Sequence, residues 1–161
     1  MEANQINQIF NAFYTYCKNK KLKVTFGGED SMNKCPFFSL KERKIHLMTK
    51  EENIHNLREM IHEWTHSTFI ITNRCCFNDY PLEELVAEKT AYEVMEHFEF
   101  YDVDSRENYT WKFKHASYIA FWVRQALKSH KGKTLDEIIE LTQPHIDVAK
   151  NLIIKLVEEE R

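Results

Sequence analysis

The chain has 161 residues, of which 43% are hydrophobic and 29% charged, and its formal net charge is −3. This length suffices to bury one sizeable core and is short for two, so we expect one domain over residues 1–161. The slightly acidic balance gives no positive field of the kind that phosphate backbones attract, which argues against nucleic acid as a partner. Since the sequence shows neither a signal-peptide pattern nor a run of eighteen apolar residues, we expect no membrane span and a cytoplasmic location.

Only three glycines and three prolines occur, which favours helices joined by short connections over an all-β fold. Apolar residues at helical spacing predict a first helix over 4–19, and alternation predicts a strand over 22–26. The segment 35–48 has the pattern of two strands around a polar turn. Thr49 and Glu52 form a capping-box pattern, which predicts a long helix from about residue 50 into the low seventies.

A connection over 73–81 follows, and the next helix begins near Pro81 and spans PLEELVAEKTAYEVMEHF. We then expect a polar loop over about 101–110, a helix over 113–129, a short helix opened by Thr134 and a last helix from Thr142. The sum is an α+β fold, dominated by helices, with a small sheet in the N-terminal third. The cysteines lack CxxC spacing, which predicts reduced structural thiols at Cys17, Cys35, Cys75 and Cys76.

The segment His62-Glu63-Trp64-Thr65-His66 matches the HExxH motif. Residues four apart project from one face of a helix, so the two imidazoles can bind one zinc ion. Glu63 lies one position along, where it can take a proton from the water that the metal activates and pass it to the leaving amine. A chain with eight histidines also produces this motif by chance, so a domain that needs no metal stays an alternative.

On the following helix, Glu84, Ala87, Glu88 and Ala91 lie on one face. Small residues let another helix approach, and carboxylates drawn into such a contact need a cation or hydrogen bonds. A catalytic zinc takes three protein ligands, so we expect Glu84 as the third ligand and Glu88 as the acceptor for the second nitrogen of a ligand histidine. Exchanged roles and an exposed acidic face stay open, and Glu83, about 100° away on the helical wheel, is the weaker candidate.

Peptide hydrolysis also needs a donor that stabilises the oxyanion, and the sequence does not distinguish among five candidates: Tyr80, Tyr92, His97, His115 and Tyr118. Each of them alone is more often structural. His46 lies in the strand over 43–48, which we expect at the edge of the sheet. An edge strand can pair with an extended substrate, so a proline at position 45 should reduce turnover.

These motifs resemble a known family. HEWTHST, NR, YPLEELVAE and SYIAFWVRQAL are similar, in this order, to the zincin-like metallopeptidase domain in the C-terminal half of ArdC-type antirestriction proteins, and the likeness covers roughly residues 36–160. The segment from Glu84 to Glu88 is similar to the third-ligand helix of gluzincin-type peptidases. The resemblance implies a zincin-like fold with the active site between two helices, Glu84 as ligand and Glu88 as support for a histidine. The DNA-binding half of ArdC-type proteins has no counterpart here, so antirestriction activity is not implied.

We therefore expect a zinc-dependent metalloendopeptidase that acts on a protein or peptide partner, with one Zn²⁺ per chain or another divalent metal in its place. The resemblance suggests a phage or mobile-element setting, and thus the cytoplasm of a host. The alternative is a non-catalytic zinc-binding domain that blocks a partner such as a repressor or a host defence protein. The sequence indicates neither the substrate nor the oligomeric state.

Overall fold

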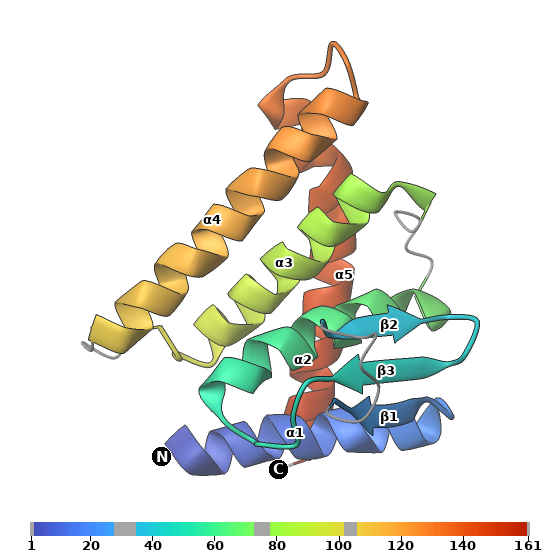
Figure 1. Ribbon diagram of the computed structural model, residues 1–161, viewed down its shortest axis with the longest axis vertical. Coiled ribbons are helices and arrows are strands. Elements are labelled where there is room, and N and C mark those ends of the chain that lie inside the picture. Colours follow the sequence, from blue (N-terminus) through green and yellow to red (C-terminus); the bar gives the residue numbers. More distant parts are fainter. Residues whose placement is uncertain (1, 28–34, 73–77, 102–105, 161) are drawn as a thin grey trace.

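The computed structural model describes residues 2–27, 35–72, 78–101 and 106–160. The expectation of a helix-dominated α+β fold with a small sheet in the N-terminal third is confirmed (Figure 1). The elements, in chain order, are α1 (Glu2–Asn19), β1 (Lys23–Phe26), β2 (Phe37–Ser39), β3 (Lys44–Leu47), α2 (Ile54–Ser67), the 3₁₀ helix η1 (Thr68–Ile70), α3 (Tyr80–His97), α4 (Arg106–Ser129) and α5 (Leu135–Glu159).

The three strands have the order β1-β3-β2, with β1 parallel and β2 antiparallel to β3. Ile45 is therefore paired on both sides, with Val24 and with Phe38. The expectation that residues 43–48 form an edge strand is wrong, because β1 adds to the free side of the β2–β3 hairpin. His46 is buried, with Nδ1 2.9 Å from the Thr25 hydroxyl oxygen and its ring stacked on Phe37.

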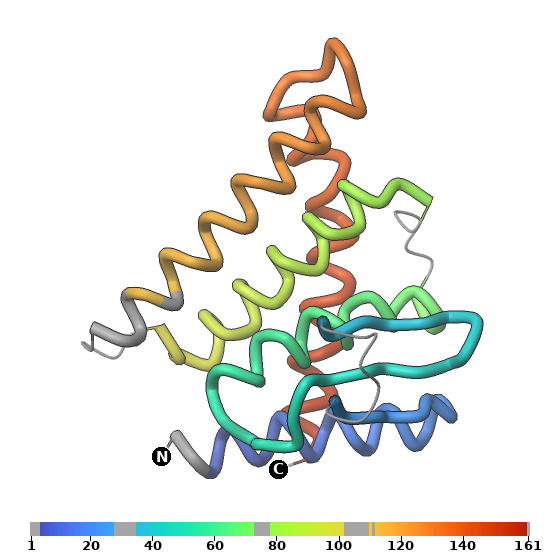
Figure 2. The backbone as a smooth tube through the Cα atoms, viewed as in Figure 1, coloured from blue at the N-terminus to red at the C-terminus, as the bar shows by residue number. Residues whose placement is uncertain are grey.

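Helix α3 is central and packs against α2, α4 and α5, while α2 also packs on β2 and β3. The smooth trace in Figure 2 shows α5 crossing behind α2 and α3, and α4 on the outside of the molecule. The main core joins α1, β3, α2, α3 and α5, and the indole of Trp64 lies within it, fully buried, against Phe13 and Tyr16. This packing fixes the face of α2 that points at α3.

Helix α2 begins later than the capping-box pattern predicts. Its N-cap is Asn53, whose side chain accepts a hydrogen bond of 3.0 Å from the backbone N–H of Asn56. The hydroxyl of Thr49 instead accepts from the backbone of Glu51, at 3.1 Å, because an Asx cap closer to the helix serves its free N–H groups. The expected single long helix is also interrupted, since η1 follows α2 directly after Ser67.

The C-terminal half has fewer and longer helices than expected. α4 already begins at Arg106, so the loop predicted over 101–110 and the helix start at 113 are wrong; residues 102–105 lie outside the described part. The two predicted last helices are one, α5, with Pro144 inside it. Its capping box of Thr134 and Glu137 is present as predicted. Burial of one continuous face offsets the hydrogen bond that the proline lacks, and this face consists of Ile138, Thr142, Ile146, Ala149, Ile153 and Val157.

Cys17 and Cys35 are free thiols, the first buried and the second exposed, as the sequence predicts; Cys75 and Cys76 lie outside the described residues. Burial raises the pKa of the Cys17 thiol to about 12, so it stays protonated. Among the described residues, no helix combines the length and the apolar character that a membrane crossing requires.

The contribution of the main core can be tested with one substitution at two positions. Phe13→Ala removes a ring that is 0% exposed, and we expect a loss of about 3–5 kcal/mol in the free energy of unfolding. Phe113→Ala removes a ring that is 65% exposed and should change the stability by less than about 0.5 kcal/mol. Urea unfolding of both variants measures the difference, and equal losses would contradict this description of the core.

Candidate metal centre

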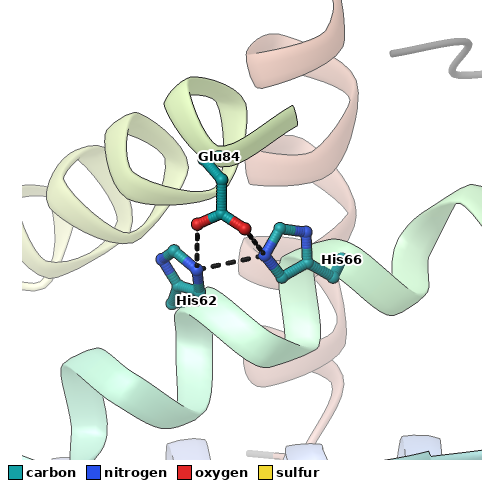
Figure 3. Close-up of side chains that lie close together, drawn as sticks. All are labelled: His62, His66 and Glu84. Carbon is teal, nitrogen blue, oxygen red and sulfur yellow. Dashed lines mark hydrogen bonds and ion pairs between the residues drawn. The ribbon is translucent and has the colours of Figure 1, made fainter. Parts of the chain in front are cut away.

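The HExxH helix and the helix after it bring three potential ligands to one point. His62 and His66 come from α2 and Glu84 from the first turns of α3, and their ligand atoms all lie within 4.8 Å of one another. Figure 3 shows the Glu84 carboxylate above the two imidazoles, with one oxygen directed at each ring. The Nε2 atoms of His62 and His66 are 3.0 Å apart, and they lie 3.4 Å and 3.6 Å from the two carboxylate oxygens.

These distances fit a metal ion at the centre of the three groups. Donor atoms bound at about 2.0–2.1 Å to a tetrahedral ion lie roughly 3.3 Å from one another. The three measured distances bracket that value, and two imidazoles with one carboxylate form a donor set that suits zinc. Three protein ligands also leave the fourth position of a tetrahedral ion open for water or substrate.

The outer nitrogens of both imidazoles face carboxylates. His66 Nδ1 lies 3.0 Å from Glu83 Oε1, and His62 Nδ1 lies 3.4 Å from Glu88 Oε1. A carboxylate accepts the Nδ1 proton and so leaves the lone pair on Nε2, where a metal ion can bind. The two Nε2 atoms that face each other should therefore carry lone pairs rather than protons. Two facing lone pairs repel, and a cation bound between them would remove this repulsion.

Glu83 has a role that the sequence pattern did not predict. It does not belong to the metal-facing cluster, in agreement with its lower rank as a ligand, but it is 3% exposed and contacts His66. The 100° offset from Glu84 turns its side chain along α2, toward the second histidine of the motif. The adjacent acids Glu83 and Glu84 could have suggested this contact, because an acid next to a ligand carboxylate can reach the imidazole of a neighbouring ligand.

Glu88 cannot easily exchange roles with Glu84, because its oxygens are already engaged. The Arg58 guanidinium donates to Oε1 at 2.5 Å, and Nε2 of His115 lies 3.2 Å from Oε2. Burial raises the pKa of Glu88, but His115, His62 and Arg58 outweigh it and hold that pKa far below its usual range. An ionised Glu88 thus lies behind His62, on the side away from Glu84 Oε2 and Nε2 of His66.

The electrostatics around the ligands favour a cation. Burial alone would lower the pKa of His62, but its contacts with the Glu84 and Glu88 carboxylates outweigh it and raise that pKa to about 10. Burial likewise opposes the charge on Glu84, yet its histidine neighbours keep the pKa of this carboxyl lowered. Without a metal, a proton on His62 supplies the positive charge that the surrounding acids require.

Glu63 differs from the other acids of the site. Its side chain is 6% exposed, and burial raises its pKa, although the two histidines act in the opposite direction. It lines the same pocket as His62, His66 and Glu84. A carboxylate with a raised pKa beside the ligands is suited to accept and return a proton.

The pocket at this centre has a volume of about 770 Å³. Phe37 and Phe38 of the edge strand β2 line one part of it, and Tyr118 and Trp122 of α4 line another. The walls are aromatic, while the floor is made of the charged groups of α2 and α3. A pocket of this size and composition accommodates an organic ligand.

The structure places two of the five candidate oxyanion donors at this pocket. Tyr80 has its hydroxyl beside Glu84 and its ring edge-on to Trp122, and Tyr118 is 51% exposed. The other three lie elsewhere. The Tyr92 hydroxyl donates to Glu96, His97 faces Glu158 across 4.0 Å, and His115 is buried behind Glu88.

Comparison of the chain with family models, with curated proteins and with solved structures gave no match. What can be said of its chemistry therefore comes from its own residues.

The contact between Glu83 and His66 can be tested by Glu83→Gln. We expect the zinc dissociation constant to rise by about 10–100-fold, because an amide holds the Nδ1 proton more weakly than a carboxylate does. Glu59→Gln is the matched control, since Glu59 lines the same pocket but is not in the ligand cluster. Competition with a chromophoric chelator measures both constants, and equal affinities of the two variants would contradict the assignment.

The raised pKa of His62 predicts a pH dependence of the metal-free protein. A folded-state pKa of about 10, above the usual 6.5, contributes stability that is fully present below pH 6.5 and lost as the pH rises through about 10. The free energy of unfolding should fall by up to about 1.4 kcal/mol per pH unit within this window. Zinc excludes the proton from His62, so the slope should vanish in the loaded protein. Denaturant titrations at pH 7 to 10 would refute this if both forms gave the same slope.

Proposed function

We propose that this chain is a zinc-dependent metalloendopeptidase that cleaves a peptide bond of a protein partner. The observation that carries the proposal is the convergence of His62, His66 and Glu84 from two helices, with distances that suit one metal ion, beside the buried Glu63. The resemblance of the motif segments to zincin-like domains points in the same direction. Zinc fits the two imidazoles and one carboxylate best.

Each group of the site has a separate role in the proposed reaction. Bound zinc would supply a Lewis acid that polarises the substrate carbonyl and makes a water molecule acidic. Glu63 takes the proton of the attacking water and delivers it to the nitrogen of the leaving amine, so that one carboxylate acts as base and then as acid. Of the five candidate donors, Tyr80 and Tyr118 line the pocket, so we assign the stabilisation of the developing oxyanion to their hydroxyl groups.

The pocket favours an extended peptide as the substrate. Among the described strands β2 lies at an edge and lines the pocket, so a peptide can pair with its outer side and lie between β2 and α4. Arg58 lines the pocket as well, but Glu88 holds its guanidinium, so it is not available for a terminal carboxylate. These features support internal cleavage of a chain rather than removal of its last residue.

Glu63→Gln tests the catalytic mechanism. The amide cannot accept the proton, so we expect zinc content equal to that of the wild type and a loss of about 10²–10⁴-fold in kcat for peptide hydrolysis. Mass-spectrometric mapping of the fragments of a denatured test protein provides the assay, since any accessible peptide bond can then serve as substrate. A zinc-loaded Glu63→Gln variant with wild-type activity would refute this role.

A second candidate is a non-catalytic zinc-binding domain that blocks a protein partner such as a repressor or a host defence protein. The observation that favours it is the aromatic surface of α4, where Phe113, Tyr118 and Phe121 are exposed and Tyr118 also lines the pocket. This function requires the surface but not the proton transfer. Under it, the Glu63→Gln variant keeps its biological effect in cells, while Phe121→Ala loses part of that effect.

A further inference from the structure

The carboxylate of Glu88 joins the candidate metal centre to helix α4. Oε1 accepts from the Arg58 guanidinium and faces His62 Nδ1 at 3.4 Å, while Oε2 faces Nε2 of His115 at 3.2 Å. These groups come from three helices: Arg58 and His62 from α2, Glu88 from α3, and His115 from α4. A single buried acid therefore contacts a candidate ligand and the outermost helix at once.

The buried atoms of this cluster depend on one another. Within the described part of the chain, His62 Nδ1, His115 Nε2 and Glu88 Oε2 have no well-aligned hydrogen-bond partner, and the nearest acceptor for both nitrogens is Glu88. Leaving such buried groups unpaired is unfavourable, because each has lost its hydrogen bonds to water. Rotation of the His62 ring toward Glu88 would complete one of these bonds, and a metal bound at Nε2 fixes the orientation of that ring.

Tyr101, on the far side of His115 from Glu88, influences which nitrogen of His115 carries the proton. Burial lowers the pKa of His115, so the ring is neutral and carries one proton, and burial raises the pKa of Tyr101, which keeps its own. The Tyr101 hydroxyl contacts His115 Nδ1 and lies 3.5 Å from Met95 Sδ. With the His115 proton on Nε2, Nδ1 accepts from Tyr101 and the proton is directed at Glu88. His115 thus connects Tyr101 to Glu88, and the contacts of His115 Nε2 and His62 Nδ1 both converge on the Glu88 carboxylate.

In the described part of the first half of helix α4, His115 is the one buried side chain. Among the described side chains of α4, only His115 and Ala126 are buried, and Ala126 lies near the far end. The Arg58 guanidinium also lies over the ring of Tyr118, 4.8 Å from its centroid, which adds a second contact from the same cluster. Figure 1 shows α4 running beside α3 on the outside of the molecule.

We propose that Arg58 and His115 are positioning residues for His62, acting through Glu88, and that a metal bound at the His62, His66 and Glu84 site in turn holds the first half of α4 against α3. The second part follows from the first, because coupling between two equilibria is reciprocal. The inference rests on the metal site of the proposed function but not on hydrolysis. It makes the aromatic wall that Tyr118 and Trp122 contribute to the pocket dependent on metal loading.

Two measurements on the full chain test this proposal. The zinc dissociation constant is determined by chelator competition, and amide hydrogen exchange of α4 is followed with and without zinc. The variants are Arg58→Met, His115→Phe and the conservative His115→Gln, which keeps an N–H near the position of Nε2. His97→Phe and Arg124→Met are the controls, since both positions lie outside the Glu88 cluster and the pocket.

We expect Arg58→Met and His115→Phe to bind zinc about 10–100-fold more weakly, His115→Gln to recover part of the loss, and both controls to match the wild type. Zinc should slow exchange in the first half of α4 in the wild type and much less in His115→Phe. Unchanged zinc affinity in both Arg58→Met and His115→Phe, or exchange in wild-type α4 that does not respond to zinc, overturns the inference. A wild type that binds no zinc overturns the metal site itself. Circular dichroism identifies any variant that fails to fold. If His115→Phe fails to fold, the zinc affinity of His115→Gln tests the proposal in its place.

Discussion

The organisation of this molecule depends on the approach of two imidazole nitrogens, His62 Nε2 and His66 Nε2, to within 3.0 Å of each other. Each ring has a carboxylate behind it, Glu88 or Glu83, which attracts the proton to Nδ1. Two lone pairs that face each other repel unless a cation lies between them. A proton on His62 is one solution, and a metal ion shared with Glu84 is the other.

This arrangement requires α2 and α3 to pack closely around buried charge. Ala87 and Ala91 are 0% exposed, and their small side chains let the two helices approach. This close packing buries Glu83 and Glu88, each of which is only 3% exposed. Buried carboxylates without compensation would cost more than the packing gains, so the cationic partners are a condition of the fold as well as of the site.

Periodicity predicted the parts that depend on one helix face. The spacing of His62, His66, Glu84 and Glu88 indicated correctly which side chains the two helices would bring together, because residues four apart always share a face. The contact between Glu83 and His66 depends on the angle at which α3 crosses α2, and a sequence pattern carries no information on that angle. The predictions for the peptidase activity and for zinc stay predictions.

The errors in the fold have similar causes. Residues 43–48 were expected at an edge, but strand order depends on where β1 adds to the hairpin, which local alternation does not reveal. A helix boundary was expected before Thr142, yet a continuous buried face carries α5 through this position and through Pro144. Thr49 and Asn53 are both good capping residues, and Asn53 is the N-cap because it directly precedes the first turn of α2.

The most direct test of the account is the zinc content of untagged wild-type protein beside the His62→Ala and Glu84→Ala variants, with Glu93→Ala as a control on the same helix as Glu84. Elemental analysis should find one zinc per chain in the wild type and the control and little in the two ligand variants. A wild type that neither carries zinc nor takes it up would contradict the metal centre, and the facing imidazoles would then be held by a proton alone.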